Sequence, residues 1–181
     1  ISPQGSRDLM AITDIPAEAE TIDYSPDGSH IAAAGDASIR FFDARTGELT
    51  LTTEPQEENL VSVDYSPDGE WVVAAGDDSA AYIFDTVTGK VKITFDDYES
   101  PDANANWATF SPDNQRVAVA GSDGRLYVFD SSSGETIFSV PGSDVEGAAD
   151  VQVSTAEFPP NGKYLTAGIN EHDSDTGGKK V

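Results

Sequence analysis

The feature that most constrains the fold of this chain is a short sequence that occurs three times and then, in altered form, a fourth time. Each occurrence is a strand-like apolar segment that ends in an aromatic residue and leads into Ser-Pro-Asp-Gly or a close variant. The serines are Ser25, Ser66 and Ser111, Pro159 takes the corresponding place in the fourth copy, and the steps are 41, 45 and 48 residues. A repeat of this period is typical of architectures in which each copy is one unit of the fold.

Each copy predicts four strands joined by tight turns. Proline sets φ near −65° at the second position of the Ser-Pro-Asp-Gly turn, and glycine tolerates the exit geometry. A strand of small apolar residues follows, then a second turn with an aspartate, and then an aromatic and β-branched strand that ends in Phe-Asp. A Thr-Gly or Ser-Gly turn leads to the fourth strand, at residues 49–52, 91–95 and 136–140. Because helix signals are nearly absent, strands at this spacing predict an all-β repeat fold.

The order of these elements is similar to that of the WD-repeat family over almost the whole chain. The Trp-Asp pair of the family corresponds to Phe-Asp in this sequence, at Phe42-Asp43, Phe84-Asp85 and Phe129-Asp130. The sequence departs from the family in one respect, since no Gly-His pair precedes any leading strand. We therefore do not expect the buried histidine network of the family in its usual form. The resemblance implies a β-propeller of four-stranded antiparallel blades, with about three complete blades and partial first and last blades.

We expect one propeller segment over residues 1–181, with blade repeats at approximately 14–53, 54–95, 96–140 and 141–181. Residues 8–12 match the fourth strand of an earlier blade, and residues 179–181 resemble the opening of a third strand in the last one. A propeller needs roughly four to eight blades to close, and an open edge exposes unpaired backbone groups. These arguments predict a chain that is incomplete at both ends, with the ring completed by missing blades or by a partner chain.

The charge of the chain restricts its partners. Asp and Glu number 33 against 10 Lys and Arg, a formal net charge of −23. Such a chain repels nucleic acids and anionic membranes, so no nucleic-acid partner is predicted. No apolar run approaches the roughly 18 residues of a membrane helix, so no membrane segment is predicted either. At about 1 M salt the Debye length is roughly 3 Å, and the composition favours adaptation to high salt over an acidic protein of ordinary salt.

The acidic loops between blades are the first candidate binding surface. They lie at residues 54–59, 96–106 and 142–150, and the family resemblance places them on one face with the turn aspartates Asp36, Asp77, Asp78 and Asp123 and with an insertion at 170–178. This face is interpreted as a binding rim for a basic or cation-bearing partner, or as a solvated acidic surface. The candidate binding residues on it are Tyr98, Glu171, His172 and Asp173.

The insertion also raises the question of a metal site. Asp173 and Asp175, with Glu171 and His172 nearby, offer oxygen ligands that suit calcium. The full calcium-loop spacing with its distal glutamate is absent, so no metal site is predicted.

Features that recur in every blade are interpreted as structural. Asp36, Asp78 and Asp123 are expected to cap local backbone donors. Trp71 and Trp107 do not repeat, and like Tyr98 they are candidate interface residues.

The sequence carries no catalytic signature. Only His30 and His172 are present, cysteine is absent, and no nucleophile elbow, phosphate loop or metalloprotease motif occurs. We therefore expect a non-catalytic scaffold for an unidentified protein partner, without a cofactor. One alternative is a propeller enzyme or quinoprotein-like cofactor-binding protein whose site lies in missing blades. Another is a cation-binding surface domain.

Overall fold

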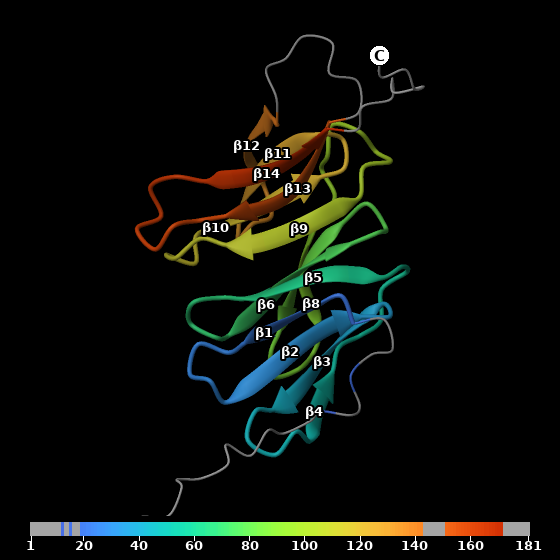
Figure 1. Ribbon diagram of the computed structural model, residues 1–181, viewed down its shortest axis with the longest axis vertical. Helices are drawn as coiled ribbons and strands as arrows, with labels where there is room; N and C mark the ends of the chain where they lie inside the picture. Colours follow the sequence, from blue (N-terminus) through green and yellow to red (C-terminus); the bar gives the residue numbers. More distant parts are fainter. Residues whose placement is uncertain (1–11, 13–14, 16–18, 143–150, 172–181) are drawn as a thin grey trace, which may run out of the picture.

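The computed structural model describes residues 12, 15, 19–142 and 151–171, and among these the regular structure is entirely β. The strands form three four-stranded antiparallel sheets and one two-stranded antiparallel sheet, each in chain order. The sheets follow one another as consecutive blades (Figure 1), which confirms the predicted all-β fold. No helix in the described part of the chain is long and apolar enough to cross a membrane.

Each blade contains the four strands that the repeat predicts. Blade 1 consists of β1 (Thr21–Tyr24), β2 (His30–Gly35), β3 (Ser38–Asp43) and β4 (Leu49–Thr52). Blade 2 consists of β5 (Leu60–Tyr65), β6 (Trp71–Gly76), β7 (Ala81–Asp85) and β8 (Val91–Phe95). Blade 3 consists of β9 (Ala105–Phe110), β10 (Arg116–Gly121), β11 (Arg125–Asp130) and β12 (Thr136–Pro141). The described part of blade 4 consists of β13 (Val151–Glu157) and β14 (Thr166–Glu171).

Three strand boundaries differ from the sequence prediction. The fourth strand of blade 3, expected at residues 136–140, extends to Pro141 in β12. The strand expected to open at Trp107 begins two residues earlier, so Ala105 and Asn106 belong to β9 and not to the preceding loop. The second strand of blade 4 runs later than expected, and Asn170 and Glu171 lie in β14 instead of in the insertion. The reason is pairing, because β13 extends back to Val151 and gives the end of β14 a partner strand.

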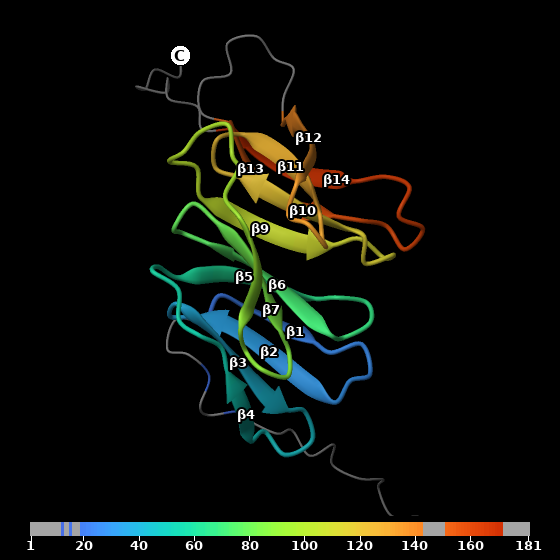
Figure 2. The same ribbon diagram turned by 180° about the vertical axis from the view of Figure 1, so that it is seen from behind.

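The blades stack face to face, with the first strand of each blade beside the first strand of the next. The strands β1, β5, β9 and β13 therefore lie side by side along one side of the molecule, as the views from the front and from behind agree (Figures 1 and 2). Within the described residues the four sheets do not close into a ring.

The hydrophobic core is divided into layers between neighbouring blades. Between blades 1 and 2, Ala32 and Ala34 of β2 pack in one cluster with Val63 and Tyr65 of β5. The same kinds of side chain fill the layers between blades 2 and 3 and between blades 3 and 4. Small side chains on the second strand let the sheets approach closely, and interiors packed at this density tolerate little change in volume.

One face of blade 1 has no described blade packed against it, and its apolar side chains are exposed. Ile22 and Tyr24 are 58% and 57% exposed, whereas Val63 and Tyr65, at the corresponding positions of blade 2, are 4% and 7% exposed. The same sequence position is therefore core in one blade and surface in another.

Side chains on the first strands hydrogen-bond to the next blade. Asp23 accepts a hydrogen bond from the backbone N–H of Tyr65 through Oδ2 at 2.7 Å. Asp64, one blade later, accepts in the same way from the backbone N–H of Phe110 at 2.7 Å. A buried backbone N–H group without an acceptor costs free energy. These carboxylates therefore stabilise the edge of the following first strand that is not paired with another strand.

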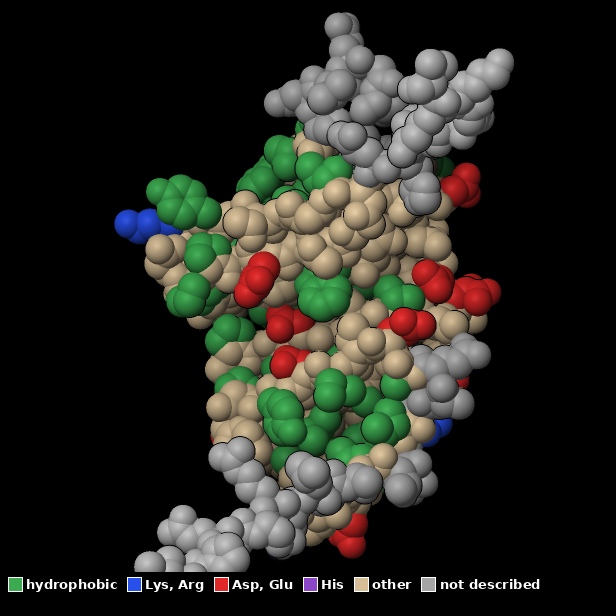
Figure 3. Space-filling view, in the orientation of Figure 1, with side chains coloured by type: hydrophobic (Ala, Val, Ile, Leu, Met, Phe, Trp, Pro, Cys, Tyr) green, Lys and Arg blue, Asp and Glu red, His purple; other side chains and the backbone are tan. Residues whose placement is uncertain are grey.

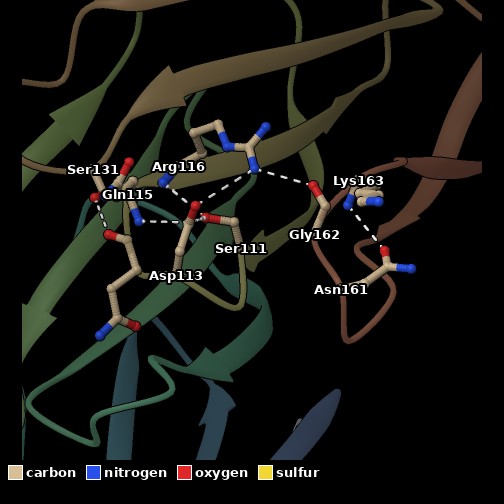
Figure 4. A network of polar contacts seen from close by, with 9 residues as sticks. Ser111, Asp113, Gln115, Arg116, Ser131, Asn161, Gly162 and Lys163 are labelled. Atoms are coloured by element: carbon tan, nitrogen blue, oxygen red, sulfur yellow. Dashed lines mark hydrogen bonds and ion pairs between the residues drawn. The ribbon is translucent and has the colours of Figure 1, made fainter.

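The Ser-Pro-Asp-Gly turns form a second set of contacts between blades, at the opposite end from the inter-blade loops. In blade 3, Ser111 donates to Asp113 at 2.5 Å, and Asp113 accepts from the backbone N–H of Gln115 at 3.1 Å (Figure 4). Arg116 forms an ion pair with Asp113 at 3.7 Å and donates to the backbone carbonyl of Gly162 in the next turn at 3.2 Å. These turns thus fix the blades to one another as well as reversing the chain.

Candidate binding face

The inter-blade loops and the turns between second and third strands lie together on one face. The backbone N–H of Gln56 donates to the carbonyl of Ala37, and that of Asp77 donates to the carbonyl of Asn59. One blade further on, the backbone N–H of Ser122 donates to the carbonyl of Asn104. We define the loop face as residues 36–37, 53–59, 77–80, 96–104 and 122–124.

The loop face carries charge of one sign. Its residues contain eleven carboxylates and no lysine, arginine or histidine, and the carboxylates are Asp36, Glu54, Glu57, Glu58, Asp77, Asp78, Asp96, Asp97, Glu99, Asp102 and Asp123. Figure 3 shows acidic side chains gathered along the right-hand edge, where these loops lie. Among the described residues, two arginines of the adjoining strands reach it, since Arg40 pairs with Asp36 at 3.7 Å and Arg125 pairs with Glu99 at 2.7 Å.

The carboxylates at the opposite end, by contrast, are used within the turns. The backbone N–H of Ser29 and the hydroxyls of Ser25 and Ser29 lower the pKa of Asp27 to about 2. The hydroxyl of Ser132 and its neighbours in the turn lower the pKa of Asp130, also to about 2. A lowered carboxylate pKa shows that local donors already stabilise the charge, so these groups have a structural role.

The turn aspartates of the loop face pair with the residue four positions further on. Asp78 accepts from the phenol of Tyr82 at 2.6 Å, and Asp123 accepts from the phenol of Tyr127 at 2.5 Å. Asp123 also accepts from the backbone N–H of Arg125 at 3.1 Å, as expected of a turn cap. For Asp78 that expectation is wrong, because its second oxygen, Oδ1, is buried and has no hydrogen-bond partner.

The carboxylates of Asp78 and Asp123 each occupy space that a side chain at a neighbouring glycine would fill. A Cβ atom at Gly76 would lie 2.6 Å from Oδ1 of Asp78, and a Cβ atom at Gly121 would lie even closer to Oδ1 of Asp123. Glycine at the end of the second strand therefore allows the turn carboxylate to fold back over the strand.

Tyr98 is the non-repeating aromatic of this face, and it lies between two blades. Its ring centroid is 4.9 Å from that of Tyr127 and 6.1 Å from that of Phe129. Its hydroxyl oxygen is buried and has no hydrogen-bond partner. Burial, followed by the nearby phenol of Tyr127 and the charges of Asp96 and Asp78, raises the pKa of Tyr98 above its usual range.

The loop that carries Tyr98 is held to blade 3. The backbone N–H of Glu99 donates to the phenol of Tyr127 at 3.0 Å, and the carboxylate of Glu99 pairs with Arg125. Burial raises the pKa of Tyr127 to about 12, so this phenol stays protonated and donates to Asp123. Tyr98 is therefore presented by an anchored loop.

A second group of carboxylates lies away from the loop face, along the first strands. Burial raises the pKa of Asp64 to about 6, the hydrogen bond from Phe110 opposes the shift, and the charges of Asp23 and Glu157 increase it. Asp23 and Glu157 occupy the position of Asp64 in blades 1 and 4. These acids share one position of the strand repeat, which Thr109 takes in blade 3, whereas Tyr98 lies outside the repeat.

Two pockets of about 470 Å³ each are present. The first lies at the Ser-Pro-Asp-Gly end between blades 1 and 2, against His30 and Phe41. The second lies against Asp64, Trp107 and Glu157 on the first strands. Neither pocket includes Tyr98, and in the described residues no set of three or more Asp, Glu or His side chains is placed to hold a metal ion.

The candidate residues from the sequence are only partly brought together. Tyr98 lies on the loop face, in contact with blade 3. Glu171 is the last residue of β14. His172 and Asp173 lie outside the described residues, so these candidates stay predictions.

Sequence reasoning missed Tyr82, Tyr127 and Arg125. The signal that could have found the two tyrosines is their place in the repeat, four residues after the turn aspartates Asp78 and Asp123. No comparable signal existed for Arg125, because its partner Glu99 lies in a loop of irregular length.

Consecutive four-stranded antiparallel blades with this turn chemistry define a β-propeller repeat protein. The model of the WD domain, G-beta repeat (WD40) matches residues 18–43, 47–85 and 91–130. The chain belongs to the WD40 repeat family. The comparison with curated proteins found no significant match.

Proposed function

We propose that this protein is a non-catalytic interaction scaffold that binds a basic segment of a partner protein through its loop face. Membership of the WD40 repeat family supports the general role, since WD40 repeat domains are generally non-catalytic scaffolds. The observation that carries the specific proposal is the charge of the loop face, with eleven carboxylates and no basic residue. Complementary charge across an interface increases the association rate and selects the partner.

The surrounding structure also supports this face over the opposite one. The turns at the other end, residues 25–29, 43–48, 66–70, 85–90, 111–116, 130–135 and 158–165, contain nine carboxylates and four basic residues. Several aspartates at that end are already stabilised by turn donors. The loop face is thus the surface with unbalanced charge.

The test compares two variants with the same loss of charge. The loop-face variant carries Glu57→Gln, Glu58→Gln and Asp102→Asn. The control variant carries Glu48→Gln, Glu70→Gln and Glu135→Gln at the other end. The side chains replaced in both variants are exposed. A partner is first identified by affinity capture and then titrated with purified proteins. We expect the loop-face variant to bind at least about tenfold more weakly than wild type, and the control to bind within about twofold. Equal binding by all three proteins would refute the proposed face.

The enzyme and cation-binding alternatives have no supporting observation among the described residues. A visible absorbance band in the purified protein would favour the cofactor alternative. Heat on calcium titration, abolished by Asp173→Asn, would favour the cation alternative.

A further inference from the structure

Arg116 of blade 3 shows how a basic side chain joins two consecutive blades at the Ser-Pro-Asp-Gly end. Its guanidinium group pairs with Oδ2 of Asp113 at 3.7 Å and donates to the backbone carbonyl of Gly162 at 3.2 Å (Figure 4). Its Cζ atom lies 5.3 Å from the ring centroid of Phe158, the aromatic residue directly after β13. A carboxylate, a carbonyl and an aromatic ring thus bind one guanidinium group.

The junction between blades 1 and 2 contains the same three kinds of group without the arginine. The repeat places a turn aspartate, a first-strand aromatic residue and a turn glycine there, and these are Asp27, Tyr65 and Gly69. All three line the pocket of about 470 Å³ at this junction, which we define as the turn pocket. The position of Arg116 is taken by His30, an exposed residue whose Nδ1 lies 2.7 Å from the hydroxyl of Ser29.

The two pairs of turns approach each other in the same way. A Cβ atom built on Gly69 would lie 3.4 Å from Cδ of Pro26 in the preceding turn. A Cβ atom built on Gly162 would lie 3.7 Å from Cδ of Pro112 in its own preceding turn. The turn pocket therefore preserves the arrangement that surrounds the arginine of blade 3.

Asp27 has one carboxylate oxygen that no described donor reaches. Its Oδ1 accepts from the hydroxyl of Ser25 and from the backbone N–H and hydroxyl of Ser29, at 2.7 to 2.9 Å. Asp113 also uses Oδ1 within its own turn, and it uses Oδ2 for Arg116. Oδ2 of Asp27 is therefore the oxygen that a guanidinium group would pair with.

The turn pocket is open because blade 1 has smaller side chains where blade 2 has large ones. In blade 2, Trp71 packs against the layer between blades 2 and 3, and the ammonium group of Lys92 lies 3.4 Å from its ring centroid. The corresponding residues of blade 1 are His30 and Thr50, which line the turn pocket. Both other junctions of the described chain thus have a cationic side chain over an aromatic ring at this end, whereas no described lysine or arginine lines the turn pocket.

We propose that the turn pocket is a second binding site, which takes the guanidinium group of an arginine side chain from another polypeptide. The guanidinium group pairs with Oδ2 of Asp27, lies over the ring of Tyr65 and donates to the carbonyl of Gly69. That carbonyl accepts from the hydroxyl of Thr86 at 3.1 Å and has a second lone pair. The site lies at the end opposite the loop face, so it is independent of the proposed function.

The lining of the turn pocket favours arginine over other cations. The planar guanidinium group can donate to a carboxylate and a carbonyl at once, which a lysine ammonium group does with less directional specificity. The apolar stem of an arginine can lie along Phe41 and Leu51, which also line the turn pocket. A free amino acid fits less well, because its own carboxylate would be repelled by those of Asp27 and Asp68.

The test titrates the ¹⁵N-labelled full chain with N-acetylarginine N-methylamide and follows backbone N–H signals by NMR. The citrulline analogue is the uncharged probe, the lysine analogue carries the same charge, and free arginine represents a small-molecule ligand. We expect the blocked arginine to shift the signals of Tyr65 and Gly69 but not that of Glu99 on the loop face. We expect no shift with citrulline, weaker binding of free arginine, and a Kd for lysine that is at least about fivefold higher.

Asp27→Asn tests the role of the carboxylate. An asparagine keeps the acceptor that the turn needs, as Asn161 of blade 4 shows by accepting from the backbone N–H of Lys163 at 3.0 Å. We expect Asp27→Asn to raise the Kd of the blocked arginine by at least about fivefold. The control, Glu135→Gln, removes an exposed carboxylate at the same end of blade 3 and should change the Kd by less than about twofold.

His30→Arg gives blade 1 the residue that blade 3 has at this position. We expect the new side chain to occupy the turn pocket, to raise the melting temperature and to weaken binding of the blocked arginine at least about tenfold. His30→Lys adds the same charge without the planar group and should have a smaller effect on both measurements.

Three kinds of result would overturn the inference. Equal binding of the arginine and lysine probes, or equal shifts at Glu99 and Gly69, would show general attraction to an acidic chain. Unchanged binding of the blocked arginine to Asp27→Asn or to His30→Arg would place the guanidinium group elsewhere. Tighter binding of free arginine than of the blocked form would exclude a polypeptide ligand. None of these results bears on the loop face, which the titration of the captured partner tests separately.

Discussion

Asp64 accepts a hydrogen bond from the backbone N–H of Phe110 at 2.7 Å and so joins the first strand of blade 2 to the first strand of blade 3. The same oxygen accepts from the hydroxyl of Thr109 at 3.1 Å. Despite these donors, burial and the charges of Asp23 and Glu157 raise the pKa of Asp64 to about 6. This contact is a structural bond and also a source of pH dependence.

We predict that Asp64→Asn raises the stability of the protein at neutral pH. A carboxyl whose pKa is raised from 3.8 to about 6 on folding contributes stability below its unfolded pKa and loses that contribution as the pH rises through about 6. The asparagine keeps an acceptor for Phe110 and does not ionise, so the free energy of unfolding should exceed that of wild type by up to about 2 to 3 kcal/mol at about pH 7.5 and match it at about pH 4. Urea unfolding at both values measures the difference. Glu70→Gln, which removes an exposed charge, is the control, and a less stable Asp64→Asn protein at neutral pH would contradict the assignment.

Ser66 is predicted to contribute more stability than the equivalent serine of blade 1. Its hydroxyl is fully buried, donates to Asp68 at 2.7 Å and accepts from the backbone N–H of Trp71 at 3.0 Å. Ser66→Ala removes both bonds and leaves a buried donor unpaired, which should cost about 1 to 3 kcal/mol. Ser25 makes the same bonds in a more exposed turn, so Ser25→Ala should cost less than half as much. Chemical denaturation of both variants decides the matter, and equal losses would show that burial has no part in the effect.

Gly76 is predicted to be required for the position of Asp78. An alanine Cβ would lie 2.6 Å from Oδ1 of Asp78 and 3.3 Å from the carbonyl oxygen of Ala80. We expect Gly76→Ala to lower the free energy of unfolding by about 1 to 3 kcal/mol through overpacking. The loss should be smaller when Asp78→Ala is introduced as well, because the nearest clashing atom is then absent. A double-mutant cycle measures this coupling, and additive losses would place the strain elsewhere.

The net charge of −23 predicts a protein that gains stability in salt. Carboxylates repel one another less as the Debye length falls, from about 10 Å at 0.1 M to about 3 Å at 1 M salt. The melting temperature should therefore rise steeply over this range of KCl. Sucrose at matched osmolality separates charge screening from general solvent exclusion, and a melting temperature that does not respond to KCl would end the halophilic interpretation.

Local chemistry explains why much of the fold could be predicted from the sequence. The turn at Ser66 and the strands β4 (Leu49–Thr52) and β8 (Val91–Phe95) depend on adjacent residues, and their bounds agree with the prediction. The end of β14 was wrong because it depends on pairing with β13, whose first residue could not be located from a loop of irregular length.

The candidate site could be predicted only as a surface. Tyr98 could be predicted as a candidate because it lies outside the repeat, and the acidic loops follow directly from the sequence. The ring contact of Tyr98 with Tyr127 could not be predicted, because it forms between a loop of irregular length and a strand of the following blade. The hydrogen bond from Phe110 to Asp64 spans 46 residues for the same reason and has no local signal.

The carboxylates of the first strands give the stack a direction. Asp23 accepts from blade 2 and Asp64 from blade 3, so two successive junctions are each held by an acid on their N-terminal side, whereas blade 3 has Thr109 at this position. When blades 2 and 3 separate, Asp64 regains its hydration, and above about pH 6 this gain offsets part of the contacts that are lost. We therefore expect hydrogen exchange at the backbone N–H of Phe110 to speed up, beyond its intrinsic increase, as the pH rises through 6. The opening free energy of the junction between β5 and β9 therefore depends on the protonation of one carboxyl group.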